Sequence, residues 1–464
     1  STVTPGTITN NGSTASTESP FDDLEGFKFG EEEDQSIIKM GTFVGNGNNS
    51  GNAIEGPLVD VGFEPQWVLT KTTVANENWN VFSSITPNSG GFINFLCPNA
   101  SDWEGTSNWF AFNSRGFQPK VSHDQVNKNG ATIAYIAIRR PDGLVGKPAE
   151  VGSAAFNMDP AGGNNAQPTF DLGFAVDANM HKQPAASTTQ FMMSDRLRGG
   201  YFFDVNSHGG EQANLNNIKY DYMNGMGAWT GDLSSYQAWG WKRGAGFDVV
   251  IYAGNGTGGR QIAHNLGRVP EMMWVKNRTG NNDWRVYHSG MVGGYDGSGN
   301  WNTDSNPAKY QIYLNKPYWA VNNTSSFNET QPTSTVFTLG TSSGVNASGN
   351  NYVNYLFSSV AGISKVGSYT GSSSALTITT GFSPRFVIIK NIRDKGNNWT
   401  TGWFVFDTTR GWAVGDSKRL RLNDMAAQTT EDWTNPISTG FAINASSGNQ
   451  LNNNGEEYIY YAHA

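Results

Sequence analysis

The strongest constraint in this 464-residue sequence is internal repetition. Residues 247–362 and 363–464 carry the same landmarks in the same order: a strand-like opening, a proline turn, a buried run ending at lysine, a tryptophan-containing run and a tyrosine-rich closing run. One matching pair is Asp283-Trp-Arg-Val-Tyr-His288 and Gly402-Trp-Phe-Val-Phe-Asp407. Self-similarity at a fixed period predicts an array of related structural units.

Two further copies precede this pair. The first contains Val61-Gly-Phe-Glu-Pro-Gln-Trp-Val-Leu69 and Asn78-Trp-Asn-Val-Phe82, which match the proline and tryptophan landmarks. The second is more divergent but keeps the closing run Tyr236-Gln-Ala-Trp-Gly-Trp-Lys242. We therefore divide the chain after residue 35 into four segments, called module 1 (36–141), module 2 (142–246), module 3 (247–362) and module 4 (363–464).

The residue types within a module indicate strands. Charged residues make up only 15% of the chain, and its 56 glycines recur with Asn, Ser and Asp between short apolar runs. Short strands separated by such turns are typical of sandwiches and barrels. An Asn-Gly or Asn-x-Gly sequence before the closing runs predicts turns with positive φ. We expect an all-β fold: about four related β-sandwich or barrel-like modules of roughly 100 residues, preceded by an extended arm.

The modules follow one another with almost no linker. Arg140-Pro141 and Ala361-Gly362 leave no room for a flexible tether. We therefore expect the four modules to pack into one rigid body, with strands that neighbouring modules could share.

Residues 1–35 differ from the rest. They are rich in Ser, Thr, Gly and Pro and end in an acidic run, so they cannot bury enough apolar surface to fold alone. One interpretation is a floppy terminus. The other is an arm that becomes ordered against a neighbouring subunit, with four apolar anchors: Phe21, Leu24, Phe27 and Phe29.

Charge and hydropathy exclude some partners. The net charge is −8, so the chain lacks the basic footprint of a nucleic-acid-binding protein. No run of 18 apolar residues is present, so we expect no membrane insertion.

Carboxylates are candidates for catalysis. A glycoside hydrolase needs two of them facing each other across a cleft. The candidates Glu64, Asp171, Glu271 and Asp407 lie at repeat landmarks or beside strands, and Glu64 and Glu271 occupy similar places in two copies. Recurrence by repeat position favours a role in the shared fold, so we expect no catalytic residues and no enzyme. The 6 histidines show no ligand spacing, and we expect no metal site and no cofactor.

Loop tryptophans are the remaining functional signal. Flat aromatic faces beside amides and carboxylates bind sugars, and the alternative is that these rings cover the ends of sandwiches. The candidates for glycan binding are Trp103, Trp109, Trp229, Trp301, Trp319, Trp399 and Trp412.

Several blocks resemble a known family. Gly62-Phe-Glu-Pro-Gln-Trp67, Ala137-Ile-Arg-Arg-Pro141 and Gly362-Ile-Ser-Lys-Val-Gly-Ser-Tyr-Thr-Gly371 are similar to blocks of repeat-containing virion structural proteins of marine tailed bacteriophages, of the cyanophage and pelagiphage kind. The resemblance covers roughly residues 30–464. It implies a fibre, spike or decoration protein and supplies no catalytic residues.

We therefore expect a bacteriophage virion structural protein, a tail or head fibre or spike component. It would attach to other capsid or tail proteins through residues 1–35 and present loops to a host-surface glycan. Such parts are commonly homo-oligomers, often trimers, and multivalency strengthens weak sugar contacts. The expected location is the virion surface, after assembly in the bacterial cytoplasm. A capsid decoration protein and a polysaccharide depolymerase are the alternatives.

Overall fold

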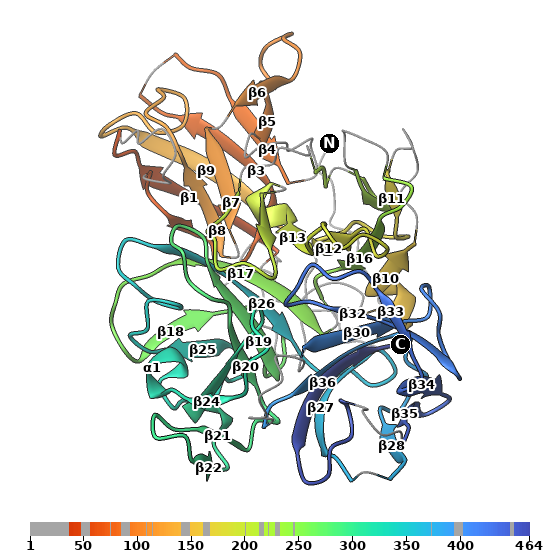
Figure 1. The fold of residues 1–464 in the computed structure, drawn as a ribbon. Coiled ribbons are helices and arrows are strands. Elements are labelled where there is room, and N and C mark those ends of the chain that lie inside the picture. Colours follow the sequence, from red (N-terminus) through yellow and green to blue (C-terminus); the bar gives the residue numbers. More distant parts are fainter. Residues whose placement is uncertain are drawn as a thin grey trace, which may run out of the picture.

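The computed structural model describes residues 37–464 except 48–55, 75, 85–92, 108, 114, 141–148, 161–167, 200, 213–217, 221, 228–232, 245, 373, 394–401 and 446–449. The all-β prediction is confirmed (Figure 1). In the described part, helical structure is limited to α1 (Thr324–Phe327) and the 3-10 turns η1 (Gly152–Ala154), η2 (Arg196–Arg198) and η3 (Pro307–Lys309). None of the helices in these residues has the length and apolar character to cross a membrane.

Module 1 has a large sheet of order β1-β9-β3-β4-β5-β6 and a small sheet of order β2-β8-β7. The strands are β1 Ile38–Val44, β2 Val59–Asp60, β3 Pro65–Thr72, β4 Asn80–Ser83, β5 Ile93–Leu96, β6 Gly105–Ser107, β7 Phe110–Asn113, β8 Gly116–Pro119 and β9 Thr132–Arg139. Module 2 has a large sheet of order β10-β16-β12-β13-β14 and a small sheet of β11 and β15. Its strands are β10 Phe156–Asp159, β11 Phe170–Asp171, β12 Ala178–Lys182, β13 Met192–Asp195, β14 Phe202–Asp204, β15 Gly225–Met226 and β16 Gln237–Trp241.

Module 3 has a large sheet of order β17-β26-β19-β20-β23-β24-β21-β22 and a small sheet of β18 and β25. The strands are β17 Phe247–Ala253, β18 Arg260–Ala263, β19 Met272–Asn277, β20 Arg285–His288, β21 Gly293–Tyr295, β22 Trp301–Thr303, β23 Tyr310–Tyr313, β24 Val321–Asn322, β25 Val336–Leu339 and β26 Asn351–Phe357.

Module 4 has a large sheet of order β27-β36-β29-β30-β32-β31, with β33 also paired to β32, and a small sheet of order β28-β35-β34. The strands are β27 Ser364–Thr370, β28 Leu376–Thr379, β29 Phe386–Asn391, β30 Trp403–Asp407, β31 Trp412–Ala413, β32 Asp416–Arg421, β33 Thr429–Glu431, β34 Thr434–Ile437, β35 Gly440–Ile443 and β36 Glu457–His463.

All four large sheets begin with the same antiparallel order. The first strand of the module pairs with its last strand, which pairs with the strand after the proline turn, which pairs with the tryptophan-landmark strand. Among the described residues, each sheet takes its strands from one module, so the expectation of shared strands is wrong. The modules are joined instead by side-chain contacts and by backbone hydrogen bonds between loops, such as the one from the Ala320 amide to the Ile392 carbonyl at 2.8 Å.

The glycines of the turn signals behave as predicted. Gly130, Gly349 and Gly455, each shortly before a closing strand, have φ of 71°, 79° and 74°. Only glycine adopts this region without steric cost, which is why the repeats keep it there.

A close contact between a glycine and a tyrosine identifies equivalent positions in modules 1 and 4. A Cβ on Gly41 would lie 2.8 Å from the Tyr135 hydroxyl, and a Cβ on Gly367 would lie 2.5 Å from the Tyr460 hydroxyl. Gly41 pairs with Tyr135, as Gly367 pairs with Tyr460. The pairs are therefore equivalent, and the pairing registers extend the equivalence along all the large sheets.

Modules 2, 3 and 4 share one hydrophobic core. In β19, Met272 and Trp274 belong to this shared core. Met273 and Val275 belong to a separate core, which also contains Phe337 and Leu339 of β25. Alternate residues of a strand point to opposite faces, so each large sheet of modules 2–4 has one face in its own sandwich and one in the shared core. This explains why β19 and β29 read as unbroken apolar runs rather than as alternating ones.

Trp241 lies where the three modules meet. Its ring is fully buried. The ring centroid lies 5.0 Å from that of Phe156 in its own module, 5.9 Å from that of Phe247 in module 3 and 6.2 Å from that of Phe386 in module 4. Its Nε1 donates to the Tyr461 hydroxyl at 3.3 Å. One side chain therefore contacts all three modules.

Equivalent polar contacts run around this core in one direction. Strands β13, β20 and β30 occupy the same place in the three large sheets. They end at Asp195, His288 and Asp407, which are equivalent register positions. Each contacts the closing strand of another module: Tyr355 Oη donates to Asp195 (2.7 Å), His288 Nε2 contacts the Tyr460 carbonyl (3.2 Å), and Trp239 Nε1 donates to Asp407 (3.1 Å). Module 2 thus contacts 3, module 3 contacts 4, and module 4 contacts 2, which is a closed pseudo-threefold ring.

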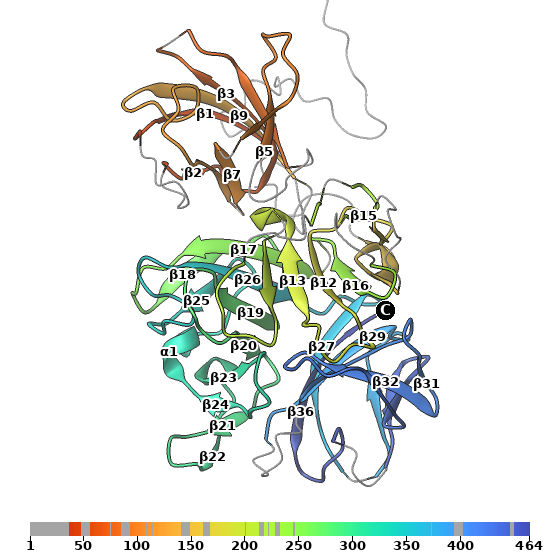
Figure 2. The same cartoon turned by 45° about the horizontal axis from the view of Figure 1, so that its top comes forward.

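Module 1 stands outside the ring. Its core lies between its own two sheets and includes Val68, Phe82, Phe110 and Phe117. Figure 2 shows β1, β3 and β9 in a lobe separate from the body formed by modules 2–4.

Candidate functional site

The four candidate carboxylates each have different partners. Asp171 is exposed and accepts from the Gly173 amide at 3.1 Å, which is a turn contact. Glu271 accepts a hydrogen bond from the Ser359 amide. Glu64 and Asp407 are buried in ion pairs. Each of these contacts is made within the fold.

Asp407 is held ionised. Burial by itself raises the pKa of its carboxyl, but the Arg410 guanidinium and hydrogen bonds from Thr409 and Gln237 outweigh that effect and lower the pKa below its usual value. Arg410 Nε lies 2.6 Å from Asp407 Oδ2. A carboxylate with this environment anchors an arginine and a neighbouring module, and it has no proton to donate near neutral pH.

Glu64 belongs to a buried charge network between module 1 and the ring. It pairs with Arg243, which also pairs with Asp248 of module 3. Arg140 lies 3.9 Å from Glu64 and 2.5 Å from Asp177, and Asp177 also pairs with Arg196. The network connects modules 1, 2 and 3 through charges rather than apolar contacts.

The tryptophan candidates have unlike surroundings. Trp103 is 93% exposed. Trp109 is half-buried and stacks on Phe95 and His123, with ring centroids 4.6 and 3.9 Å away. Trp412 is only 2% exposed and donates Nε1 to the Thr434 carbonyl at 3.1 Å, so it is a core residue and offers no face to a glycan.

Two candidates are brought together on module 3. Tyr295 packs edge-on against Trp301 and Trp319, with centroids 5.1 and 5.7 Å away, and the Arg393 guanidinium lies 5.3 Å from the centre of the Trp301 ring. Trp229 and Trp399 lie outside the described residues, as do the arm candidates Phe21, Leu24, Phe27 and Phe29.

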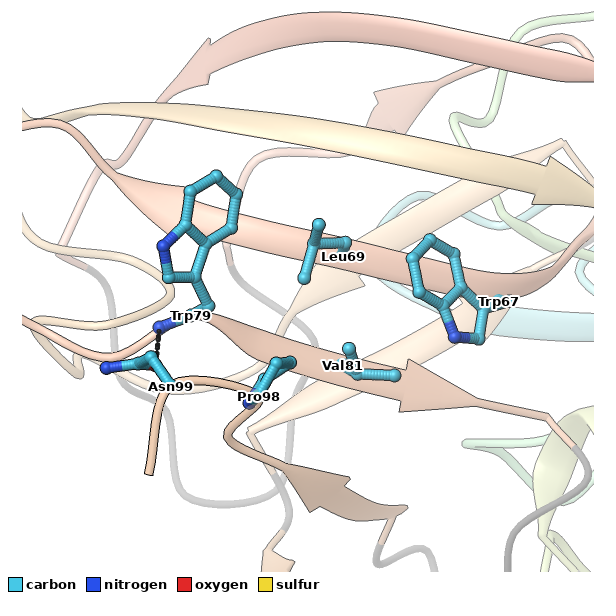
Figure 3. Close-up of a pocket in the computed structure, with 6 residues that line it drawn as sticks. All are labelled: Trp67, Leu69, Trp79, Val81, Pro98 and Asn99. Atoms are coloured by element: carbon cyan, nitrogen blue, oxygen red, sulfur yellow. Dashed lines mark hydrogen bonds between the residues drawn. The ribbon is translucent and has the colours of Figure 1, made fainter. Parts of the chain in front are cut away.

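An open apolar surface lies on module 1. A shallow hollow of about 480 Å³ is lined by Trp67, Leu69, Trp79, Val81, Pro98 and Asn99 (Figure 3). The Trp79 amide donates to Asn99 Oδ1 at 2.9 Å, which holds the two loops of the hollow together. Beyond β3, the same face of the sheet continues through β9 to β1, where Ile38 is 57% and Met40 72% exposed. We call this surface, from β1 across β9, β3 and β4, the module 1 face.

A family comparison covers nearly the whole chain. The model described as a domain of unknown function, DUF7483, matches residues 4–140 and 163–464. The chain belongs to the DUF7483 family. No curated protein matches this DUF7483 protein.

In the DUF7483 protein, no group of three or more His, Cys, Asp or Glu side chains in the described ranges is arranged to hold a metal ion. The module 1 face was not predicted from the sequence. The sequence did carry a signal that this face is apolar, because Asn78-Trp-Asn-Val-Phe82 matches two segments whose tryptophans, Trp284 and Trp403, are buried.

Buried histidines predict an acid-sensitive fold for the DUF7483 protein. Burial lowers the pKa of His181 and of His288 to about 4, and that of His463 to about 3. Below pH 6.5 the unfolded chain binds protons that the folded chain excludes, so the free energy of unfolding should fall as the pH drops from about 6.5 toward 4. Each histidine contributes at most about 3 kcal/mol to this loss.

The measurement is denaturant unfolding at several pH values in this window, for the wild type and His288→Gln. The variant should show a shallower pH dependence, because one of the proton-binding differences has been removed. Equal slopes in both proteins would contradict the assignment of a buried neutral imidazole at His288.

Proposed function

We propose that this DUF7483 protein is a bacteriophage virion structural protein, a tail or head fibre or spike component that attaches through its N-terminal arm and presents loops for host-surface glycan adhesion. The observation that carries the proposal is the shared core of modules 2–4. Three sandwiches fixed around one core hold their connecting loops in a constant arrangement, which suits display. The Trp301, Trp319 and Tyr295 cluster is one aromatic surface on such a body.

The buried polar groups support a structural role. Asp407 and Glu64 are buried, as catalytic carboxylates often are, but each contacts a side chain of another module: Asp407 accepts from Trp239, and Glu64 pairs with Arg243. The resemblance of the repeat blocks to virion proteins of marine tailed phages points the same way. The proposed location is the virion surface.

The arm can be tested directly. Particles assembled with a chain lacking residues 1–35 should lack the protein, while the purified truncated chain should keep the far-ultraviolet circular dichroism of the full chain. Incorporation of the truncated chain into particles would refute attachment through the arm.

A glycan array probed with the full chain separates adhesion from decoration. Binding to host-surface sugars supports the fibre or spike role. A capsid decoration protein with a purely mechanical role should bind none. Release of reducing ends from host polysaccharide would instead support a depolymerase.

A further inference from the structure

The module 1 face is the counterpart of the surface that modules 2–4 bury in their shared core. Met40 occupies the position of Val249 in module 3 and Val366 in module 4, since each lies opposite the equivalent closing-strand residue. Both counterparts are fully buried in the shared core, whereas Met40 is 72% exposed. The same repeat surface is therefore covered three times in this chain and left open once.

The tryptophan landmark shows the same contrast. Trp79 lies two residues before Val81, which pairs with Leu69, as Trp284 lies two before Val286 and Trp403 two before Val405. Trp284 and Trp403 are shared-core residues, and Trp79 is 40% exposed. Leu96 of β5 pairs with Val81 and is exposed, whereas its counterparts in the shared core are buried: Phe203, Ile312 and Leu420.

We propose that the module 1 face is the interface of a homotrimer, in which the first modules of three chains pack around a threefold axis as modules 2, 3 and 4 pack within one chain. The occupant of the face is two further copies of this chain. The proposal uses only the repeat geometry and does not depend on the virion function.

The geometry of the ring favours copies over an unrelated partner. The contacts between modules 2, 3 and 4 are directional and close after three units, and a head-to-tail contact that closes in this way generates a threefold ring when the units are identical. Modules 2–4 show that this repeat surface is self-complementary in such a ring. An exposed apolar sheet face is otherwise unusual in a monomer.

A lysine contact that recurs in modules 2, 3 and 4 extends the comparison. Strands β12, β19 and β29 carry a lysine at equivalent positions: Lys182, Lys276 and Lys390. Each lysine donates to a backbone carbonyl of a neighbouring module, at Met425, His208 and Pro317 respectively. Each acceptor lies five residues after Leu420, Phe203 or Ile312. Lys71 is the equivalent lysine, and it donates to the Glu77 carbonyl of its own loop, as Lys276 does to Asn282.

The repeat register therefore names a partner for Lys71. Five residues after Leu96 stands Ser101, so Lys71 of one chain is expected to reach the Ser101 carbonyl of the next chain. The trimer would thus reproduce the apolar contacts and the lysine contacts of the shared core. The contacts of Asp195 and Asp407 have no counterpart, because Ser83 and Ile136 stand at the equivalent positions of module 1.

The test is the mass of the full chain in solution, measured by light scattering after size exclusion and by analytical ultracentrifugation across a range of concentrations. The expected mass is three times that of the chain. Met40→Asp and Trp79→Asp should each give monomers, because a carboxylate would be buried in the new core. Val414→Asp, at an 80% exposed apolar residue on module 4, is the matched control and should remain trimeric.

Calorimetry and circular dichroism of each variant check that it is folded. The monomeric variants should keep the circular dichroism spectrum of the wild type. A monomeric wild type, a dimer, or a trimer unaffected by both substitutions would overturn the proposal. A wild type that forms trimers only after removal of residues 1–35 would also overturn it, by showing that the arm of the same chain occupies the face. Failure of the particle and glycan tests would leave the mass unchanged, so the two proposals fail separately.

Discussion

Replacing Trp241 by alanine is expected to lower the free energy of unfolding of modules 2–4 by about 3–5 kcal/mol, the range for a fully buried tryptophan. The ring packs against phenylalanines of three modules, so its loss leaves a cavity that no single module can close by itself. The hydroxyl of Tyr461 also loses its indole donor. Denaturant unfolding followed by circular dichroism measures the change.

Trp103→Ala is the matched control, because that side chain is 93% exposed. It should leave the unfolding curve unchanged. The shared core also predicts that modules 2–4 unfold in one transition even in Trp241→Ala. Separate transitions for modules 2, 3 and 4 would show that the core does not couple them.

Replacing Asp407 by alanine is expected to cost about 3–5 kcal/mol, because it leaves the Arg410 guanidinium buried without its counterion. The indole of Trp239 and the amide of Gln237 lose acceptors at the same time. The effect should therefore appear as weakened packing between modules 4 and 2. Chemical denaturation measures the loss of stability.

The double variant Asp407→Ala with Arg410→Met should recover most of that stability, since removing both charges avoids the uncompensated one. Asp124→Ala is the control, because Asp124 pairs with Lys128 at an exposed surface and should have no measurable effect. Equal costs for Asp407→Ala and Asp124→Ala would contradict the role of Asp407 as an anchor between modules.

The ring of modules changes how the candidate residues are understood. Asp407 is a candidate catalytic carboxylate by its sequence, but in the structure it holds module 2 against module 4. Trp412, considered as a sugar platform, fills the core between the sheets of module 4. In both cases the functional residue type was used for packing, because a repeat that buries both faces of its large sheet needs bulky aromatics and internally paired charges.

The sequence by itself determined the strand class and the repeat. Glycines with positive φ before the closing strands, and prolines at or just before strand starts, reflect local backbone sterics, which depend on near neighbours in the chain. The landmark order shared by four segments is visible in the sequence itself. The apolar runs of β19 and β29 were also predicted to be buried strands.

Only the tertiary structure decided which modules cover one another. Trp79, Trp284 and Trp403 occupy the same place in the repeat, yet two are buried in the shared core and one faces outward on module 1. Their local sequences resemble each other because each sheet needs an apolar face. Whether that face meets another module depends on contacts between residues far apart in the chain, such as Asp407 with Trp239, and those arise only when the whole chain has packed.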